Sequence, residues 1–261
     1  GGNMASAIIG GLIHQGHPAS QIEVVEPWAE AREALRKNYG IEAQAEAGPA
    51  LQRAQIVVWA VKPQTFKDAA AQAKAHTQGA LHLSVAAGIR SDSIAQWLGT
   101  ERIVRTMPNT PALVGKGMSA LYARPAVSAP ERQSIEAIMA TTGEFLWVDS
   151  EPQLDAVTAL SGSGPAYVFY FLEAMTRAGT DMGLTAAQAH QLAVGTFVGA
   201  SELARRSDET PAVLRQRVTS KGGTTYAALQ SMEAAGVAAS FEAAMRAAQH
   251  RAHELGDEFG A

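Results

Sequence analysis

The chain has 261 residues, of which 47% are hydrophobic, and a formal net charge of -4 at pH 7. This charge gives no basic surface for nucleic acid or acidic membranes, and the absence of cysteine excludes disulfides and thiolate chemistry. No apolar stretch has spanning length and no signal-peptide pattern is visible, so we expect a cytoplasmic enzyme of one large or two ordinary domains.

The first residues have the pattern of a glycine-rich phosphate turn that continues into a helix. Gly2 and Ala5 match the last two fixed positions of the fingerprint G-x-G-x-x-G/A, whose glycines let backbone N–H groups approach a pyrophosphate. The positive end of the following helix would face the same anion. We therefore expect a dinucleotide site, with the first glycine of the fingerprint and its strand upstream of residue 1. A glycine-rich helix start that binds nothing is the alternative.

From residue 22 to about 150, short apolar strands alternate with alanine-rich amphipathic segments. This alternation is typical of a parallel sheet covered by helices, an α/β fold. The predicted strands are Ile22–Glu26, Ile41–Ala43, Ile56–Val61, Leu81–Val85, Arg102–Met107, Met118–Ala123 and Glu144–Val148. The predicted helices are Trp28–Tyr39, Gln64–Thr77, Ser91–Leu98 and Ala129–Thr142.

After residue 150 the pattern is entirely helical, which predicts two domains, 1–150 and 151–261. The predicted helices are Pro165–Ala178, Ala186–Arg206, Pro211–Val218, Tyr226–Ala235 and Phe241–Glu258, and Thr185 with Gln188 forms a capping box. The first of these helices is apolar on every side, which indicates burial on every side. A partner chain with interleaved helices is the simplest way to bury it, so we expect an obligate homodimer or a multiple of dimers.

In an open α/β sheet the ligand lies outside the carboxyl ends of the strands, so residues after each strand are candidates. Glu26 ends a strand about 24 residues after Gly2, where an acidic side chain accepts hydrogen bonds from the adenosine ribose and favours NAD. It could equally be an exposed charge. Lys62 could reach the cofactor or point to solvent, and the small residues 84–88 could admit a flat ring or close-pack a strand end. Asn109 is held between two prolines in a turn that could be purely structural.

Two turns rich in Ser, Gly and Thr precede helices in the second half of the chain. Ser161–Pro165 is not a nucleophile elbow, because the G-x-S-x-G spacing and the preceding strand are both missing. Thr219–Thr225 carries more hydroxyls and glycines than a helix cap needs, which favours a carboxylate site. No metal is expected, since the pairs His14/His17 and His250/His253 show no obvious acidic partner or third histidine.

Five motifs in this order resemble the pyrroline-5-carboxylate reductase family, and the match runs over essentially the whole chain. Gly1–Ala5 is similar to the family's nucleotide turn, Ala60–Gln64 to its A-V-K-P segment and Met107–Pro111 to its M-P-N-T-P turn. Leu160–Tyr167 resembles its S-G-S-G-P-A-Y helix start, and Val218–Thr225 a variant of its T-S-x-G-G-T-T turn. Any one of these could occur by chance, whereas the five together are specific.

The resemblance implies an N-terminal Rossmann-like domain, a C-terminal helical dimerisation domain, and reduction of 1-pyrroline-5-carboxylate to L-proline by hydride transfer from NAD(P)H, the last step of proline biosynthesis. The implied cofactor-binding residues are Gly2, Asn3, Met4, Glu26, Ala60, Val61, Lys62, Pro63, Ala86, Ala87, Gly88 and Asn109. The implied substrate-binding residues are Ser220, Gly222, Gly223, Thr224 and Thr225, with Thr225 catalytic and near the ring nitrogen. Part of each active site would come from the partner's helices.

Two departures from the family pattern affect the expected cofactor. Ala47 stands where members often have an asparagine that contacts adenosine, and Glu26-Pro27-Trp28 stands where residues suited to a 2′-phosphate are common. The cofactor is therefore expected to be NADP or NAD, with NAD tolerated.

An imine substrate agrees with the residue types. From Ser161 to Met175 there is no Lys, His or Asp to protonate a ketone oxygen, and Glu173 lies two turns beyond the helix start. A cyclic imine can arrive already protonated, so the site needs only alignment and carboxylate binding. The alternatives are another imine or β-hydroxyacid reductase, which a ketoacid panel would distinguish, and a non-catalytic dinucleotide sensor, which would bind cofactor without turnover. For catalysis, the bend near residue 223 must face the nicotinamide across a cleft.

Overall fold

The computed structural model describes residues 2–260, so Gly1 of the nucleotide turn lies outside the described part. The chain divides into two compact units: a sheet unit of Gly1–Pro165 with Ala247–Ala261, and a helical unit of Ala166–Arg246. The predicted domain boundary at residue 150 stays a prediction about functional domains. Residues 151–165 belong to the sheet unit, because Glu151 pairs with Arg105 and Leu154 is buried there.

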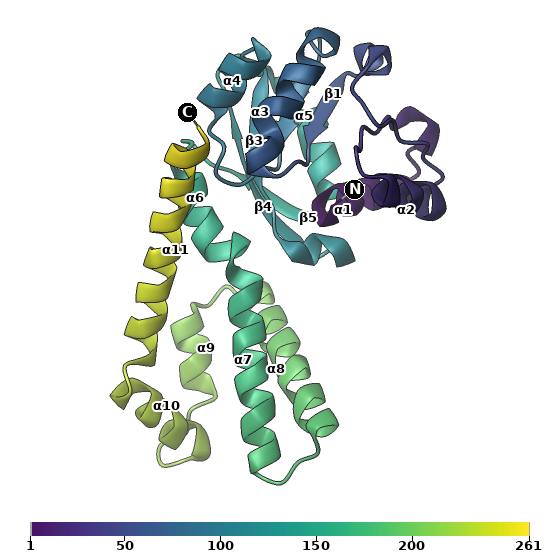
Figure 1. Cartoon of the computed structure of the whole chain (residues 1–261). Coiled ribbons are helices and arrows are strands. Elements are labelled where there is room, and N and C mark those ends of the chain that lie inside the picture. Colours follow the sequence, from purple (N-terminus) through teal and green to yellow (C-terminus); the bar gives the residue numbers. More distant parts are fainter. Residues whose placement is uncertain (1, 261) are drawn as a thin grey trace. The chain divides into compact units, whose positions relative to one another are not determined.

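The sheet unit contains a five-stranded sheet in the order β1-β2-β3-β4-β5 (Figure 1). The strands are β1 Ile56–Trp59, β2 Leu81–Ser84, β3 Ile103–Met107, β4 Gly117–Ala123 and β5 Gly143–Trp147. All neighbouring pairs are parallel except β3 and β4, which are antiparallel, so the prediction of a parallel sheet is wrong at this pair. The reason is the connection between them, a single short helical turn at Thr110–Val114, because parallel strands need a longer crossover.

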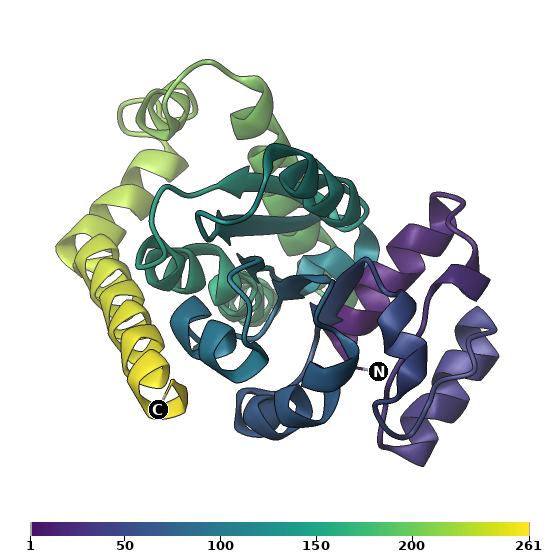
Figure 2. The same ribbon diagram turned by 90° about the horizontal axis from the view of Figure 1, so that it is seen from above.

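Helices cover both faces of this sheet (Figure 2). On one face, α3 Pro63–Ala73 and α4 Ser91–Leu98 bury Phe66 and Ile94 against Trp59 and Ile103. On the other face, α5 Ala129–Ala140 buries Ile135 and Met139 against Leu83 and Val104. The predicted alternation of strands and helices between residues 56 and 148 is thereby confirmed as a three-layer α/β arrangement.

In place of the predicted strands Ile22–Glu26 and Ile41–Ala43, the structure has one isolated parallel bridge, between Val25 and Gln44, the residue after the second predicted strand. In the described residues, no further strand pairs with this segment, so the ladder does not extend. The segment is held instead by apolar packing, since Ile41 is buried with Ile9 of α1 (Asn3–His14) and Leu35 of α2 (Ala29–Tyr39).

The region before the first apolar helix has more structure than its sequence predicts. Residues 153–162 form α6, Gln153–Val157, followed directly by a π-helical turn, Thr158–Gly162. The next helix, α7, begins at Gly164 and ends at Asp181. The expected turn at Ser161–Pro165 is therefore reduced to a bend at Ser163, between the π-helical turn and the start of α7.

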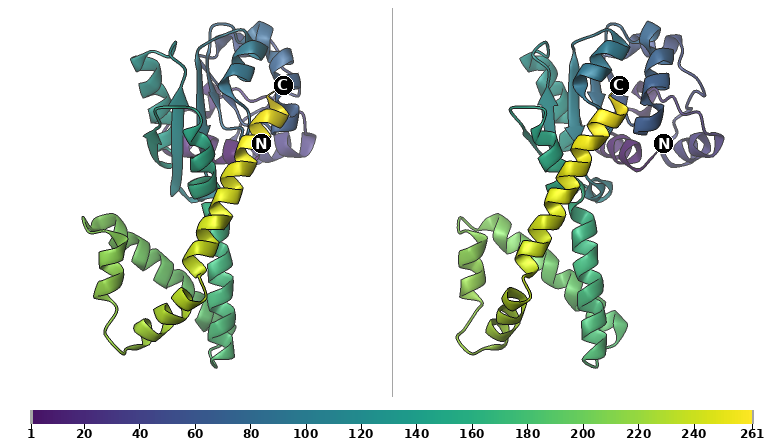
Figure 3. Two further views of the ribbon diagram at one scale, coloured as in Figure 1. Left: turned by 90° about the vertical axis from the view of Figure 1, so that its left-hand side faces the viewer. Right: turned by 60° about the vertical axis from the view of Figure 1, so that its left-hand side comes forward.

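The helical unit comprises most of α7, then α8 Ala186–Arg206, α9 Pro211–Arg217, α10 Thr224–Ala234 and the first part of α11 Val237–Phe259 (Figure 3). The predicted capping box of Thr185 and Gln188 at the start of α8 is confirmed. Rings of Tyr167 and Phe171 on α7 contact Phe241 of α11, with centroids 5.4 and 5.8 Å apart. This aromatic cluster joins the two helices within the unit.

The first apolar helix is not buried on every side within the single chain, so its burial by a partner chain stays a prediction. Phe169 and Tyr170 of α7 are 63% and 70% exposed. Exposed apolar side chains also occur along α8, at Leu192, Val198 and Leu203. No helix in the described residues is both long and apolar enough to cross a membrane. Exposed apolar side chains gathered on two helices in this way are typical of a protein interface.

Candidate cofactor and substrate sites

The amino terminus of α1 has the properties of an anion site. Gly2 is the N-cap residue and provides no side-chain cap, and the first turn contains no acidic residue. The free N–H groups of this turn therefore lack partners from within the helix and carry the positive end of its dipole. No atom lies within 4 Å of the position that a Cβ on Gly2 would occupy, so a phosphate can approach the backbone. Gly2, Asn3 and Met4 thus fit a dinucleotide pyrophosphate.

The structure brings the predicted nicotinamide-end residues together at the carboxyl ends of β1 and β2. Trp59, the last residue of β1, is in register with Ser84, the last residue of β2, and the Val85 N–H donates to the Trp59 carbonyl at 3.1 Å. Residues 60–63 and 85–88 therefore leave the sheet side by side. Ala86 is buried, whereas Ala87 and Gly88 are half-buried, which leaves small groups and backbone at this edge.

Lys62 is the N-cap residue of α3 and Pro63 is its first residue. The Lys62 side chain is exposed, so the alternative that it points to solvent stays open alongside cofactor contact.

Asn109 has both ends of its side-chain amide engaged within the protein. Its Nδ2 donates to the Ser161 carbonyl at 3.1 Å, and its Oδ1 accepts from the Met118 N–H at 2.9 Å. The side chain therefore ties the turn after β3 to the π-helical turn before α7 and to the start of β4. This geometry favours the structural alternative for the Asn109 side chain, although its backbone remains at the carboxyl end of β3.

Glu26 lies at the end of the extended segment predicted for ribose binding, and its Oε1 accepts from the Trp28 N–H at 3.1 Å. Sequence reasoning missed Arg32, whose Nη1 donates to the Glu26 carbonyl at 2.9 Å and to the Pro27 carbonyl at 2.7 Å. A guanidinium is therefore fixed on the Glu26–Pro27 backbone, and a basic group at this point suits a 2′-phosphate. Arg32 could have been found from sequence because it lies one turn into the helix that follows the predicted strand Ile22–Glu26.

The amino terminus of α10, in the helical unit, also has the properties of an anion site. The helix begins at Thr224, two residues before the predicted start, with Gly223 as N-cap residue, no side-chain cap and no acid in the first turn. Thr219 is not free, because its hydroxyl donates to the Arg215 carbonyl at 2.7 Å. Among the described residues no hydrogen bond involves the hydroxyls of Ser220, Thr224 or Thr225. The predicted carboxylate site therefore has free N–H groups and free hydroxyls.

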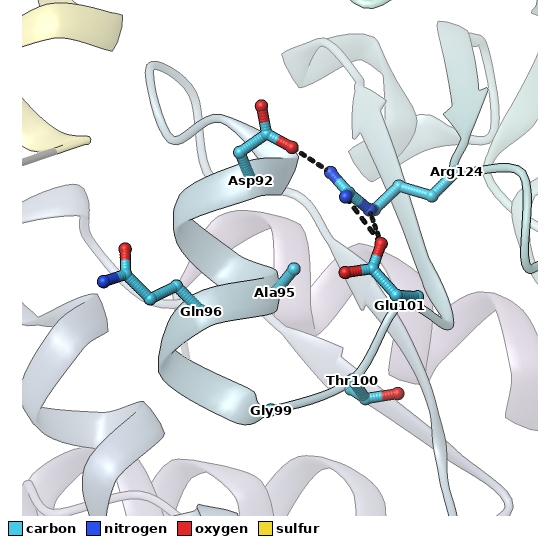
Figure 4. Close-up of a pocket in the computed structure, with 7 residues that line it drawn as sticks. All are labelled: Asp92, Ala95, Gln96, Gly99, Thr100, Glu101 and Arg124. Carbon is cyan, nitrogen blue, oxygen red and sulfur yellow. Dashed lines mark hydrogen bonds and ion pairs between the residues drawn. The ribbon is translucent and has the colours of Figure 1, made fainter.

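A solvent-open hollow of about 450 Å³ lies apart from these residues, beside the amino-terminal end of β3 (Figure 4). Arg124 at its wall pairs with Asp92 and with Glu101, whose carboxylate accepts from Nε at 2.7 Å. The single guanidinium is engaged by two carboxylates, so the hollow offers no free cation for an anionic ligand. It also lies at the sheet edge opposite the carboxyl ends of the parallel strands.

The histidine pairs differ from the sequence analysis in one respect. His250 Nε2 lies 3.2 Å from Glu254, four residues further along the same helix, and His253 Nδ1 lies 3.4 Å from Asp155, which is distant in the sequence. Both histidines therefore have acidic partners. No cluster of three or more potential metal ligands occurs within residues 2–260.

Comparison with known proteins relates the whole chain to one family. A family model described as pyrroline-5-carboxylate reductase dimerisation matches residues 151–255, and one described as NADP oxidoreductase, coenzyme F420-dependent, matches residues 1–88. A pyrroline-5-carboxylate reductase of Pseudomonas aeruginosa is 45% identical and covers 99% of this chain and 96% of its own length. A solved pyrroline-5-carboxylate reductase from Coxiella burnetii has a TM-score of 0.89 at 36% identity, covering 97% of this chain and 95% of that one. The Plasmodium falciparum pyrroline carboxylate reductase with NADP bound has a TM-score of 0.88 at 27% identity, covering 98% and 95%.

Proposed function

The chain belongs to the pyrroline-5-carboxylate reductase family, and from this premise we propose that it reduces 1-pyrroline-5-carboxylate to L-proline with NADPH or NADH. The supporting structural observation is the free amino terminus of α10, which offers N–H groups and three unengaged hydroxyls to a carboxylate. Residues 1–150 form the cofactor domain in this proposal, and residues 151–261 the substrate and dimerisation domain.

The reduced nicotinamide, when bound, supplies the hydride that adds to the C=N carbon. The turn at Gly2–Met4 holds the pyrophosphate by its free N–H groups. Ala60–Pro63 and Ala86–Gly88 line the nicotinamide end, where their small groups admit a planar ring. These residues would bind the cofactor and orient its nicotinamide ring toward the substrate. Such positioning is the larger part of catalysis when two reactants must meet in one geometry.

The substrate carboxylate is held at Gly223 and Thr224, and the Thr225 hydroxyl lies at the ring nitrogen. In the protonated imine the nitrogen already carries a proton, and addition of hydride to carbon converts the C=N bond to a single bond while that proton stays on nitrogen. No proton donor has to act in this step. This agrees with the absence of Lys, His and Asp between Ser161 and Met175, and with the exposure of Glu173.

Either reduced dinucleotide fits the residues at the adenosine end. Glu26 favours the free ribose hydroxyls of NADH, whereas Arg32, fixed on the Glu26 and Pro27 carbonyls, favours a 2′-phosphate. We propose that the enzyme uses both, with Arg32 supporting NADPH.

The active form is proposed to be a homodimer or a multiple of dimers, acting in the cytoplasm. The exposed apolar side chains of α7 and α8 are the surface that a second copy would cover, including Phe169, Tyr170 and Leu203. Part of each substrate site then comes from the partner subunit.

The deciding experiment measures oxidation of NADPH and of NADH with 1-pyrroline-5-carboxylate, and with a panel of β-hydroxyacids and ketoacids in parallel. We expect turnover with the imine only. Cofactor binding without turnover would instead support a dinucleotide sensor, and turnover of a ketoacid would support a hydroxyacid reductase.

A further inference from the structure

The last turn of α11 packs against the segment that follows β2. Gly88 has a positive φ of 74°, and a Cβ added to it would lie 2.9 Å from the Leu255 Cβ. One residue further along α11, a Cβ on Gly256 would lie 2.9 Å from Nε and 3.2 Å from Nη2 of Arg90. Gly88 is therefore needed for the close approach of the two segments, whereas a methyl group at Gly256 would displace only the flexible end of the Arg90 side chain.

Polar contacts also join the end of α11 to the segment after β2. Arg90 Nη2 donates to Asp257 Oδ1 at 2.6 Å, and Ser93 Oγ donates to the Gly260 carbonyl at 2.7 Å. These bonds join residues 167 positions apart in the chain. Phe259 adds an apolar contact, because it packs on the core cluster that contains Ala86 and Ile89. Residues 255–260, here named the C-terminal latch, thus contact residues 86–93 through packing, an ion pair and a hydrogen bond.

The α4 helix that begins after this segment has a separate anchor. Glu151 Oε1 accepts from the Ser91 N–H at 2.6 Å and from Arg105 Nη1 at 2.5 Å, while Oε2 accepts from Ser91 Oγ at 2.5 Å. The Arg105 and Glu151 side chains are only 9% and 17% exposed, so this anchor is strong and shielded from water. Loss of the C-terminal latch would therefore free residues 86–90 without unwinding α4.

We propose that the C-terminal latch is a positioning element of the nicotinamide site. It holds Ala86, Ala87 and Gly88 at the distance and angle that hydride transfer requires, acting through Arg90 and through the close contact of Leu255 with Gly88. This proposal rests on the proposed function, which assigns residues 86–88 to the nicotinamide end. Arg90, Gly256 and Asp257 are positioning residues in this scheme, since they touch neither substrate nor cofactor.

Two variants test the latch in the full-length protein. Asp257→Asn removes the charge pair with Arg90, and Gly256→Ala places a methyl group where the Arg90 guanidinium now lies. In each, we expect faster amide hydrogen exchange at residues 86–90 in the cofactor-free protein and weaker NADPH binding by calorimetry. We expect kcat to fall about tenfold while the KM for 1-pyrroline-5-carboxylate stays unchanged, and the kinetic isotope effect with deuterated NADPH to rise. Gly256→Ala should not lower the melting temperature, because alanine favours a helix.

The matched control is Glu254→Gln, which lies just outside the latch on the same helix and removes the ion pairs with Arg251 and His250 and none of the contacts with residues 86–93 described above. It should behave as wild type in every measurement. The proposal is refuted if Asp257→Asn and Gly256→Ala both match this control in exchange, NADPH affinity and kcat. If wild type itself fails to reduce the imine, the proposed function fails, whereas the exchange and binding measurements still decide the latch.

Discussion

Replacing His82 with glutamine should remove an acid-sensitive part of the stability of the sheet unit. His82 lies in β2 and is 1% exposed, and its Nδ1 accepts a hydrogen bond from Trp59 Nε1 at 2.9 Å. Burial lowers the pKa of His82 to about 4, a hydrogen bond with the Thr77 backbone opposes this shift, and the charge of Arg102 adds to it. The folded protein therefore keeps this imidazole neutral at pH values where an exposed histidine is charged.

The sign of the effect follows from which state binds the proton. An unperturbed histidine has a pKa of 6.5, so between pH 6.5 and about 4 the unfolded chain binds a proton that the folded chain does not. The contribution of His82 is fully present above pH 6.5, is lost as the pH falls through this window, and changes no further below it. A shift from 6.5 to about 4 is roughly 2.5 pKa units, and at about 1.4 kcal/mol per unit it corresponds to a loss on the order of 3 kcal/mol.

Urea unfolding at a series of pH values, at one fixed protein concentration, measures this loss. Glutamine at residue 82 can still accept the Trp59 hydrogen bond but does not titrate, so the free energy of unfolding of His82→Gln should fall less on acidification than that of wild type. The exposed His17 supplies the control, and His17→Gln should follow wild type. Parallel curves for wild type and His82→Gln between pH 6.5 and 4 would show that His82 is not the buried, neutral group described here.

Three further outcomes test the site. Thr225→Ala should raise the KM for 1-pyrroline-5-carboxylate about tenfold through loss of one hydrogen bond, and Thr225→Ser should partly restore it. NADPH affinity, measured by cofactor titration, should stay unchanged, and an equal change in both constants would contradict the assignment of Thr225 to the substrate. Arg32→Gln should raise the KM for NADPH several-fold and leave that for NADH alone, and an equal rise in both would mean that Arg32 only supports the Glu26–Pro27 backbone. Asn109→Asp keeps the acceptor for the Met118 N–H but loses the donor to the Ser161 carbonyl, so urea denaturation should show a loss of about 1–3 kcal/mol, and wild-type stability would mean that this contact contributes little.

Elements with local start and stop signals are the part of the fold that sequence predicts best. The bounds of α4 and α8 are confirmed to the residue, since Gly99 ends the first and the Thr185–Gln188 capping box begins the second. The strands between residues 56 and 147 are confirmed because their apolar runs lie between helices at the spacing of an α/β sheet.

Features that depend on distant partners were not predictable in this way. The apolar run at Ile22–Glu26 has strand composition, yet a strand exists only where a neighbour pairs with it, and Val25 finds one bridge. The antiparallel direction of β4 follows from the length of its connection, which the alternation of strands and helices does not reveal. The π-helical turn at Thr158–Gly162 likewise has no composition signal that distinguishes it from a loop.

The candidate sites show the same difference between local signals and contacts with distant residues. The uncapped helix starts at Gly2 and Gly223, which are the candidate anion sites, could be proposed from sequence because a free helix amino terminus is a property of a few adjacent residues. The support of those sites is not local: Asn109 reaches Ser161, and Arg90 reaches Asp257 across most of the chain. A motif therefore identifies the groups that touch a ligand, whereas the groups that hold them in place are spread through the sequence and carry no motif. For this reason we expect substitutions in the C-terminal latch to change hydride transfer, although they lie far from every recognisable motif and sequence comparison alone would miss them.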